Sequence, residues 1–196
     1  VSPVNDAPAL TLADTSIYEN TTFVTQATVA DPDLSDTGST ESHSFSIFSG
    51  ADQAFFQIDG DGNLSFKAAP NYESPQDDDS GNTYAVTVRV TDVAGLTSDQ
   101  AITVSVQNTN DAPTFTTVTT TYQVAENQTS AAVIAAADED VGQTPTYSIS
   151  GGVDKDLFQI VGAEGVLTFK SAPNFESPSA VGGSNDYLVE ITVTDN

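Results

Sequence analysis

Apolar and polar residues alternate in short runs along this chain, and Gly, Pro, Asn and Asp separate one run from the next. A period of two places successive side chains on opposite faces of a β-strand with one buried face. The clearest run predicts four core residues, Tyr84, Val86, Val88 and Val90. Helical periodicity is nearly absent. Short strands between turn residues are typical of an all-β sandwich.

The alternation predicts strands in both halves of the chain. Those of the first half lie near Ala9–Ala13, Thr22–Val29, Ser44–Phe48, Phe55–Asp59, Leu64–Lys67, Tyr84–Thr91 and Ala101–Val106. Those of the second half lie near Ala131–Ala136, Thr146–Ile149, Leu157–Val161, Val166–Lys170 and Tyr187–Thr194. The second half has no counterpart of Thr97–Val106, which would leave the strand before it unpaired. Either the natural chain continues or a strand is supplied from elsewhere.

The two halves are copies of one another. Phe56-Gln-Ile58 returns as Phe158-Gln-Ile160, and Asn5-Asp-Ala-Pro8 returns as Asn110-Asp-Ala-Pro113. A period of roughly 103 residues is too long for a solenoid unit and suits a self-sufficient sandwich domain. We expect two tandem seven-strand Greek-key sandwiches, the second lacking its last strand. Domain 1 spans residues 1–108, with a linker remnant at 1–8, and domain 2 spans 109–196.

The running direction of each strand decides at which end of a sandwich the next loop lies, because successive strands connect opposite ends. Counted this way, one end of domain 1 collects Glu19, Asn71, Glu73, Asn108, Asn110 and Asp111. The facing end of domain 2 collects Asp138, Asp140 and Asp195. The other end of domain 1 forms an N-terminal half-site of Asp6, Asp31, Asp33 and Asp92. Domain 2 repeats the glutamates in a C-terminal half-site of Glu126 and Glu176.

Six carboxylates are thus expected to meet at the joint between the domains. Like charges at such density repel one another and raise one another's pKa unless a cation neutralises them. Oxygen ligands of variable geometry, with no nitrogen or sulfur donor among them, favour Ca²⁺ over zinc. The sequence therefore predicts calcium sites that stiffen the joint.

Composition narrows the classes of function. The chain has 28 acidic and 4 basic residues, a formal net charge of −24. Such a surface repels nucleic acid and anionic membranes. The absence of Cys excludes disulfides, zinc–thiolate sites and thiol catalysis. No apolar run approaches the roughly 18 residues of a membrane helix, and no signal peptide is present. We interpret the chain as an internal piece of a longer protein.

Other polar motifs have simpler explanations than chemistry. Asp59-Gly-Asp-Gly-Asn63 is best interpreted as a hairpin turn, since Asp-Gly and Gly-Asn favour turns. Asp77–Asp79 is expected to be a solvated loop. His43 has no counterpart in the second repeat and no repeated Ser partner. Asp31 and Asp33 lie at a domain end without a sugar cleft, which a glycosidase requires. An enzyme is therefore not expected.

The motifs together resemble those of tandem cadherin repeats found in large bacterial surface proteins. The resemblance rests on x-Glu-Asn at Glu19 and Glu126, Asp-x-Asp at Asp31/Asp33 and Asp138/Asp140, the Asn-Asp-x-Pro linker, and Asp92 and Asp195 after the sixth strand. It covers nearly the whole chain and implies up to three Ca²⁺ per joint. Two departures each remove a charge. The family's Asp-Arg-Glu reads Asn71-Tyr72-Glu73 here, and its first linker Asp reads Asn108.

We therefore expect an extracellular or cell-surface module in which Ca²⁺ at the joint rigidifies a multi-repeat array. Its partners would be neighbouring repeats of the same chain, with no nucleic acid and no direct membrane insertion. The alternative is an adhesin module that binds carbohydrate or another cadherin-like domain through a sandwich face. No Trp is present to stack on a sugar, and most aromatic residues fall on core positions or beside the metal motifs.

Overall fold

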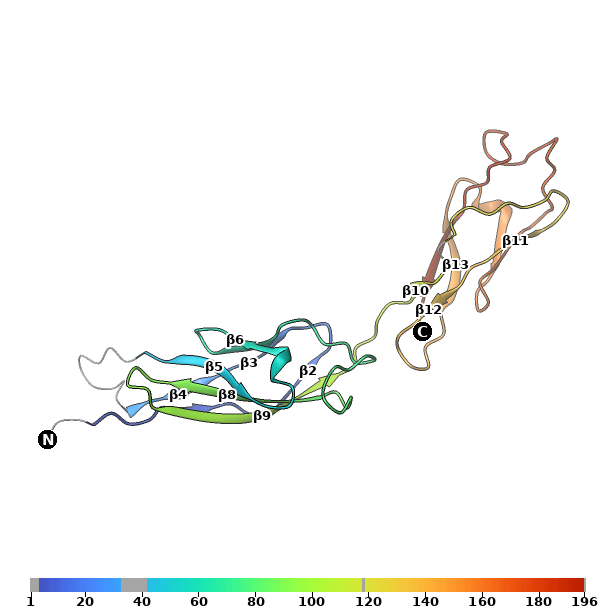
Figure 1. The fold of residues 1–196 in the computed structure, drawn as a ribbon. Helices are drawn as coiled ribbons and strands as arrows, with labels where there is room; N and C mark the ends of the chain where they lie inside the picture. The colour runs from blue at the N-terminus through green and yellow to red at the C-terminus, as the bar shows by residue number, and fades with distance from the viewer. Residues whose placement is uncertain (1–3, 33–41, 118, 196) are drawn as a thin grey trace. The chain divides into compact units, whose positions relative to one another are not determined.

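The structure is a computed structural model that describes residues 4–32, 42–117 and 119–195. Asp33, one of the expected half-site residues, lies outside the described residues. The chain divides into two compact units, Val1–Thr109 (unit 1) and Asn110–Asn196 (unit 2). Both consist of short β-strands with a few residues of 3₁₀ helix (Figure 1). No helix of the described residues is long and apolar enough to span a membrane.

Unit 1 contains two main sheets and a short strand pair. The larger sheet has the order β2 (Thr15–Tyr18), β9 (Thr97–Gln107), β8 (Thr83–Thr91) and β5 (Ser44–Ser49). The second has the order β3 (Phe23–Gln26), β7 (Asn63–Phe66) and β6 (Phe56–Ile58). The pair is β1 (Ala9–Thr11) with β4 (Thr28–Ala30), and the 3₁₀ helix η2 (Gln53–Phe55) precedes β6.

The core of unit 1 lies between these sheets, on the faces that the alternation predicts. Tyr84, Val86, Val88 and Val90 of β8 are buried, and so are Ile102, Val104 and Val106 of β9. Each buried apolar side chain of this size contributes roughly 1.5–3 kcal/mol. The Tyr84 ring meets Phe66 edge-on, with 5.0 Å between ring centroids. The predicted all-β sandwich, with its core faces, is therefore confirmed.

Two strands of unit 1 differ from the prediction because they change partners. The first predicted strand, Ala9–Ala13, matches only β1, which pairs with β4. After a division at residues 12–14 the chain forms β2, which the alternation did not predict and which runs parallel to β9. At the division Asp14 accepts a hydrogen bond from the backbone N–H of Thr103 at 2.7 Å. The second predicted strand divides at Ala27, whose N–H bonds to the Gly62 carbonyl in a turn. Residue periodicity reports which face is buried and not which strand is the partner.

Unit 2 repeats most of this arrangement. One sheet has the order β11 (Ser130–Val133), β15 (Val166–Phe169) and β14 (Phe158–Val161). The other pairs β13 (Thr146–Gly151) with β16 (Glu190–Thr194), and β10 (Thr114–Phe115) pairs with β12 (Ala136–Ala137). The 3₁₀ helix η3 (Lys155–Leu157) precedes β14. Phe158, Leu167 and Phe169 form the buried centre.

The described part of unit 2 contains no counterpart of β9, as the sequence predicts. β16 pairs with β13 alone. Residues 122–125, which correspond to β2, form no strand there. An open cavity of about 840 Å³ remains, and Phe169, Tyr187 and Val189 are among its lining residues. In unit 1 the equivalent space is filled by the apolar face of β9.

Candidate metal centre

Glu19 is the buried carboxylate at one end of unit 1. It follows β2, and because β2 runs parallel to β9, both strands end at the same pole. The Glu19 N–H donates to the Gln107 carbonyl at 3.0 Å. The residue is 1% exposed. Its two carboxylate oxygens accept hydrogen bonds from the backbone N–H of Tyr72 at 2.7 Å and of Thr109 at 2.9 Å. Glu19 thus ties the loop after β7 to the segment after β9.

Glu73 lies on that loop and is half-buried. Its Oε1 accepts a hydrogen bond from the side-chain amide of Asn108 at 2.8 Å. Asn71 uses its own side-chain oxygen to accept from the Ser74 N–H at 2.7 Å, which closes a tight turn. The turn presents Glu73 on the side of the loop that faces the end of β9.

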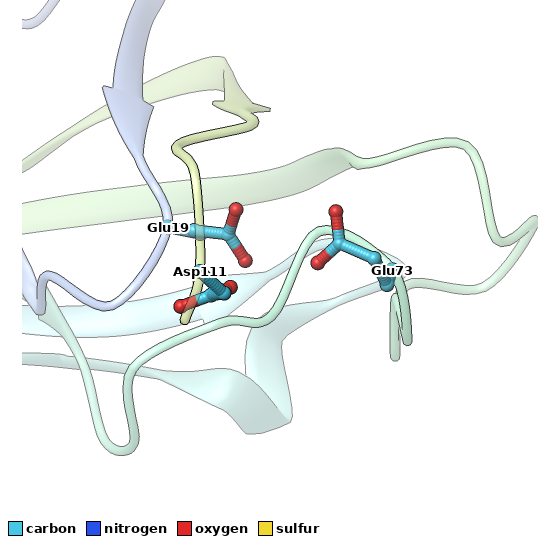
Figure 2. A group of neighbouring side chains, drawn as sticks. All are labelled: Glu19, Glu73 and Asp111. Atoms are coloured by element: carbon cyan, nitrogen blue, oxygen red, sulfur yellow. The ribbon is translucent and has the colours of Figure 1, made fainter. Parts of the chain in front are cut away.

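Three carboxylates converge at this pole. Oxygens of Glu19, Glu73 and Asp111 lie within 4.8 Å of one another. Figure 2 shows Glu19 and Asp111 beside each other with Glu73 on its loop next to them. Asp111 belongs to the segment that continues from β9. Ca²⁺ takes 6–8 oxygen ligands at 2.3–2.6 Å, so carboxylates at this spacing need small side-chain movements to share one ion.

Unit 2 begins with a second polar network, around its Asp-x-Asp motif. Asp140 is buried and accepts a hydrogen bond from the Asp111 N–H at 2.7 Å. The Asp140 N–H in turn donates to Asp138 Oδ1 at 3.0 Å. Asp138 Oδ2 is buried and has no hydrogen-bond partner among the described residues. A buried carboxylate oxygen without a donor is costly, and a cation beside it would remove that cost.

Asn110 completes this network. Its side-chain amide donates to Asp195 at 2.5 Å, and its side-chain oxygen accepts from the Gln143 amide at 2.7 Å. Within unit 2 the structure therefore links Asn110 to Asp195, and Asp111 through Asp140 to Asp138. The atoms of these side chains that could ligate a cation are carboxylate and amide oxygens, which are the ligands that Ca²⁺ prefers.

The N-terminal half-site repeats part of this network. Asn5 donates to Asp92 at 2.7 Å, as Asn110 does to Asp195. The hydrogen bond from Asn5, together with backbone N–H groups, outweighs burial and lowers the pKa of Asp92. The Asp31 side chain is 1% exposed and meets His43 Nε2 at 2.9 Å. Asp6 is exposed on the linker remnant.

The C-terminal half-site is more open. Glu126 accepts from the Phe175 N–H at 3.1 Å, just as Glu19 accepts from Tyr72, but Glu126 is exposed. Glu176 is exposed as well, and its N–H donates to Asn174 Oδ1 at 2.9 Å. Among the described residues these two glutamates join no group of three clustered carboxylates.

No model of a known protein family matches the chain, and neither does any curated protein. Solved structures do match it. The Drosophila N-cadherin EC1-4 structure aligns with 94% of this chain and 44% of its own, at 15% identity and a TM-score of 0.57. The chain has the fold of tandem cadherin repeats. Two structures of human protocadherin-24 EC1-2 align over 98% and 97% of this chain and 97% and 96% of their own. Their identities are 19% and 20%, and their TM-scores 0.48 and 0.49.

Several of the matched structures, among them the N-cadherin structure and two protocadherin structures, are longer than this chain. It spans about half of their length, 44% of the N-cadherin structure and 52% of each of two protocadherin structures, gamma B2 EC3-6 and gammaB7 EC3-6.

Each cadherin-like unit also contains a buried carboxylate that the sequence analysis did not identify. Asp52 is 3% exposed and accepts from the N–H groups of Asp78 at 2.8 Å and Ala85 at 2.7 Å. Asp154, 2% exposed, does the same with Val181 and Leu188. In both units the carboxylate ties together two backbone segments that are far apart in the sequence from it. The signal was present, because an Asp stands four residues before both copies of Phe-Gln-Ile.

The prediction of a solvated loop at Asp77–Asp79 is wrong for Asp77. Asp77 is buried, and its carboxylate accepts from the backbone N–H of Gly81 at 2.8 Å. Burial raises the pKa of Asp77, but the hydrogen bonds that its carboxylate makes, that from Gly81 foremost, outweigh burial and leave the pKa below its ordinary value. Asp59, by contrast, is a turn residue as predicted, because its carboxylate accepts from the backbone N–H of Asp61 and Asn63.

Proposed function

We propose that this chain is a calcium-dependent structural and adhesion module of a multi-repeat extracellular array, such as that of a bacterial adhesin. Ca²⁺ bound where one repeat joins the next would hold the two at a fixed angle. The observation that carries the proposal is the group of three carboxylates formed by Glu19, Glu73 and Asp111. The buried Asp138 Oδ2, which has no hydrogen-bond partner among the described residues, supports a second set of ligands.

Each side of the joint contributes ligands in this proposal. Those before and on the connecting segment are Glu19, Asn71, Glu73, Asn108, Asn110 and Asp111, and those after it are Asp138, Asp140 and Asp195. Carboxylate oxygens that already accept one backbone N–H keep a second lone pair for a cation. The hydrogen bonds of Glu19 to two loops therefore orient it for an ion without using up its capacity.

The six carboxylates explain why the ion would stiffen the array. Without a cation their repulsion favours separation of the residues that carry them, and screening by salt is weak for partly buried charges. Three Ca²⁺ would balance six carboxylates in charge. An ion that binds both repeats then links their orientations, because separating them would strip it of ligands.

The carbohydrate-binding alternative has less support. The larger sheet of unit 1 carries two exposed aromatic rings, Tyr18 at the end of β2, at 59% exposure, and Phe48 of β5, at 47%. The second of them, Phe48, is not open to a ligand. The Arg89 guanidinium covers this ring, with its Cζ 3.4 Å from the ring centroid. Arg89 is itself fixed by two 2.7 Å hydrogen bonds to Asp99. A ring covered in this way is a poor platform for a sugar. Partners of the cadherin type, or neighbouring repeats, fit the proposal better.

The test is a calcium titration by calorimetry, combined with small-angle scattering and thermal unfolding in chelator and in millimolar Ca²⁺. We expect saturable binding, a raised melting temperature and a narrower distribution of interdomain angles. At 100-fold excess over the dissociation constant, each site adds about 2.7 kcal/mol of stability. Identical melting curves and scattering profiles in the two conditions would refute the proposal. A glycan array probed with and without Ca²⁺ tests the alternative.

A further inference from the structure

The two peptide planes on either side of the Tyr72 α-carbon are each held by a side-chain hydrogen bond. The Tyr72 N–H donates to Glu19 Oε2 at 2.7 Å. The Tyr72 carbonyl accepts from the side-chain amide of Asn82 at 2.8 Å. The second of these planes leads directly into Glu73. Fixing both planes fixes the position of the Glu73 α-carbon, and with it the reach of the Glu73 carboxylate.

Unit 2 repeats the arrangement with the equivalent residues of its own sequence. The Phe175 N–H donates to Glu126 at 3.1 Å, and the Phe175 carbonyl accepts from the Asn185 amide at 3.1 Å. The same pair of hydrogen bonds precedes the second glutamate of each unit, Glu73 and Glu176. The residues around the two glutamates are nearly the same in both units, but the six residues before each asparagine, 76–81 and 179–184, differ at every position. The recurrence of the pair across two such different loops indicates a requirement of the site and not an accident of one turn.

Asn82 is well anchored for this task. Its carbonyl accepts from the Val106 N–H at 2.9 Å, which ties it to the core strand β9. Its backbone has a φ of 60°, a left-handed conformation that Asn tolerates better than most residues. Its Oδ1 is buried without a hydrogen-bond partner among the described residues, so the side chain acts on the loop through its amide N–H group.

We infer that Asn82 is a positioning residue for the metal centre: it holds the Tyr72–Glu73 peptide so that the Glu73 carboxylate meets those of Glu19 and Asp111. Asn185 makes the equivalent hydrogen bond to the Phe175 carbonyl, but Glu176 belongs to no group of three clustered carboxylates among the described residues, so Asn185 is a matched control. The inference rests on the proposed calcium function. Residues that orient metal ligands typically change metal affinity by 10–100-fold when they are replaced.

The test compares Asn82→Gly with Asn185→Gly in the whole chain. Glycine accepts the left-handed backbone at position 82, so the first variant removes the side chain without adding backbone strain. In chelator both variants should lose a similar amount of thermal stability. In calcium titrations Asn82→Gly should weaken Ca²⁺ binding about tenfold, and Asn185→Gly should leave it unchanged. Hydrogen exchange in chelator should also accelerate at residues 72–74 in Asn82→Gly alone.

A second variant, at the same residue, distinguishes the positioning of Glu73 from a simple effect of charge on Ca²⁺ binding. It also replaces the first variant in the test if Asn82→Gly does not fold. Asn82→Asp keeps the shape of the side chain but sets a carboxylate oxygen against the Tyr72 carbonyl. A positioning role predicts weaker Ca²⁺ binding despite the added negative charge, whereas a charge effect alone would strengthen binding. Unchanged affinity in Asn82→Gly, or stronger binding in Asn82→Asp, overturns the inference while the proposed function stands. If the unaltered chain binds no Ca²⁺, both are wrong.

Discussion

Asn110 donates a side-chain hydrogen bond to Asp195, 85 residues further along the chain. Asn5 makes the same bond to Asp92 in unit 1. Both asparagines open a copy of Asn-Asp-Ala-Pro, and the two aspartates follow equivalent strands, β8 in unit 1 and β16 in unit 2. The motif at the start of each unit is therefore fastened to the same corner of its own sandwich, which places the next residue, Asp6 or Asp111, at that pole.

Replacing Asn5 by Ala should raise the pKa of Asp92. The hydrogen bond from Asn5 is the largest cause that lowers this pKa. A folded-state pKa below the unfolded one stabilises the protein above the unfolded value of 3.8, and this stability is lost as the pH falls through the folded pKa. Carboxyl titration by NMR measures the shift. Asp99, whose pKa is lowered by Arg89, is the internal control and should not move.

Asp140→Ala should damage calcium binding more than Asp31→Ala. Asp140 is linked through its hydrogen bonds to both Asp111 and Asp138, beside the connecting segment. Asp31 already meets His43 at 2.9 Å, and it belongs to no group of three clustered carboxylates among the described residues. Calorimetric titrations of the two variants measure the difference. Equal losses would show that the assignment of aspartates to the two poles is wrong.

The repeated motifs allowed most of the strands, and the residues expected at each pole, to be predicted from the sequence. Each motif occurs at the same place in both copies, so an assignment made in one copy could be checked in the other. The partner changes of β2 and the burial of Asp77 were not predictable in this way. Which strand lies beside Thr15–Tyr18 depends on the long-range pairing with β9. The depth of Asp77 depends on a loop that folds back onto its carboxylate. Local periodicity contains neither piece of information.

Replacing Asp52 by Asn should destabilise unit 1 by about 1–3 kcal/mol, the cost of leaving a buried donor without its acceptor. The amide would set an N–H group against the N–H of Ala85 or Asp78, where the carboxylate now accepts both. Thermal unfolding with separate probes for the two units measures the effect. Asp61→Asn, on an exposed turn, is the matched control and should change little. Comparable losses in the two variants would argue against the role of Asp52 as a clamp.

The last prediction concerns the open cavity of unit 2. A copy of Ala94–Gln107 joined to the C-terminus should stabilise unit 2 far more than unit 1. In unit 1, Val86 pairs with Ile102 and Tyr84 with Val104, so the grafted strand should pair with Val189 and Tyr187. Its three apolar side chains would each contribute roughly 1.5–3 kcal/mol once buried. That sum is comparable with the 5–15 kcal/mol that stabilises a whole domain.

Hydrogen exchange decides this prediction. Without the graft, amides of Leu188–Thr194 should exchange faster than those of Val86–Thr91, because β16 pairs with β13 alone and β8 pairs on both sides. With the graft the two rates should approach each other. A graft of equal length with serine at its three apolar positions is the control, since it can form hydrogen bonds without filling the cavity. Equal protection in the ungrafted, dilute and monomeric chain would mean that unit 2 closes its core without a strand of the β9 type.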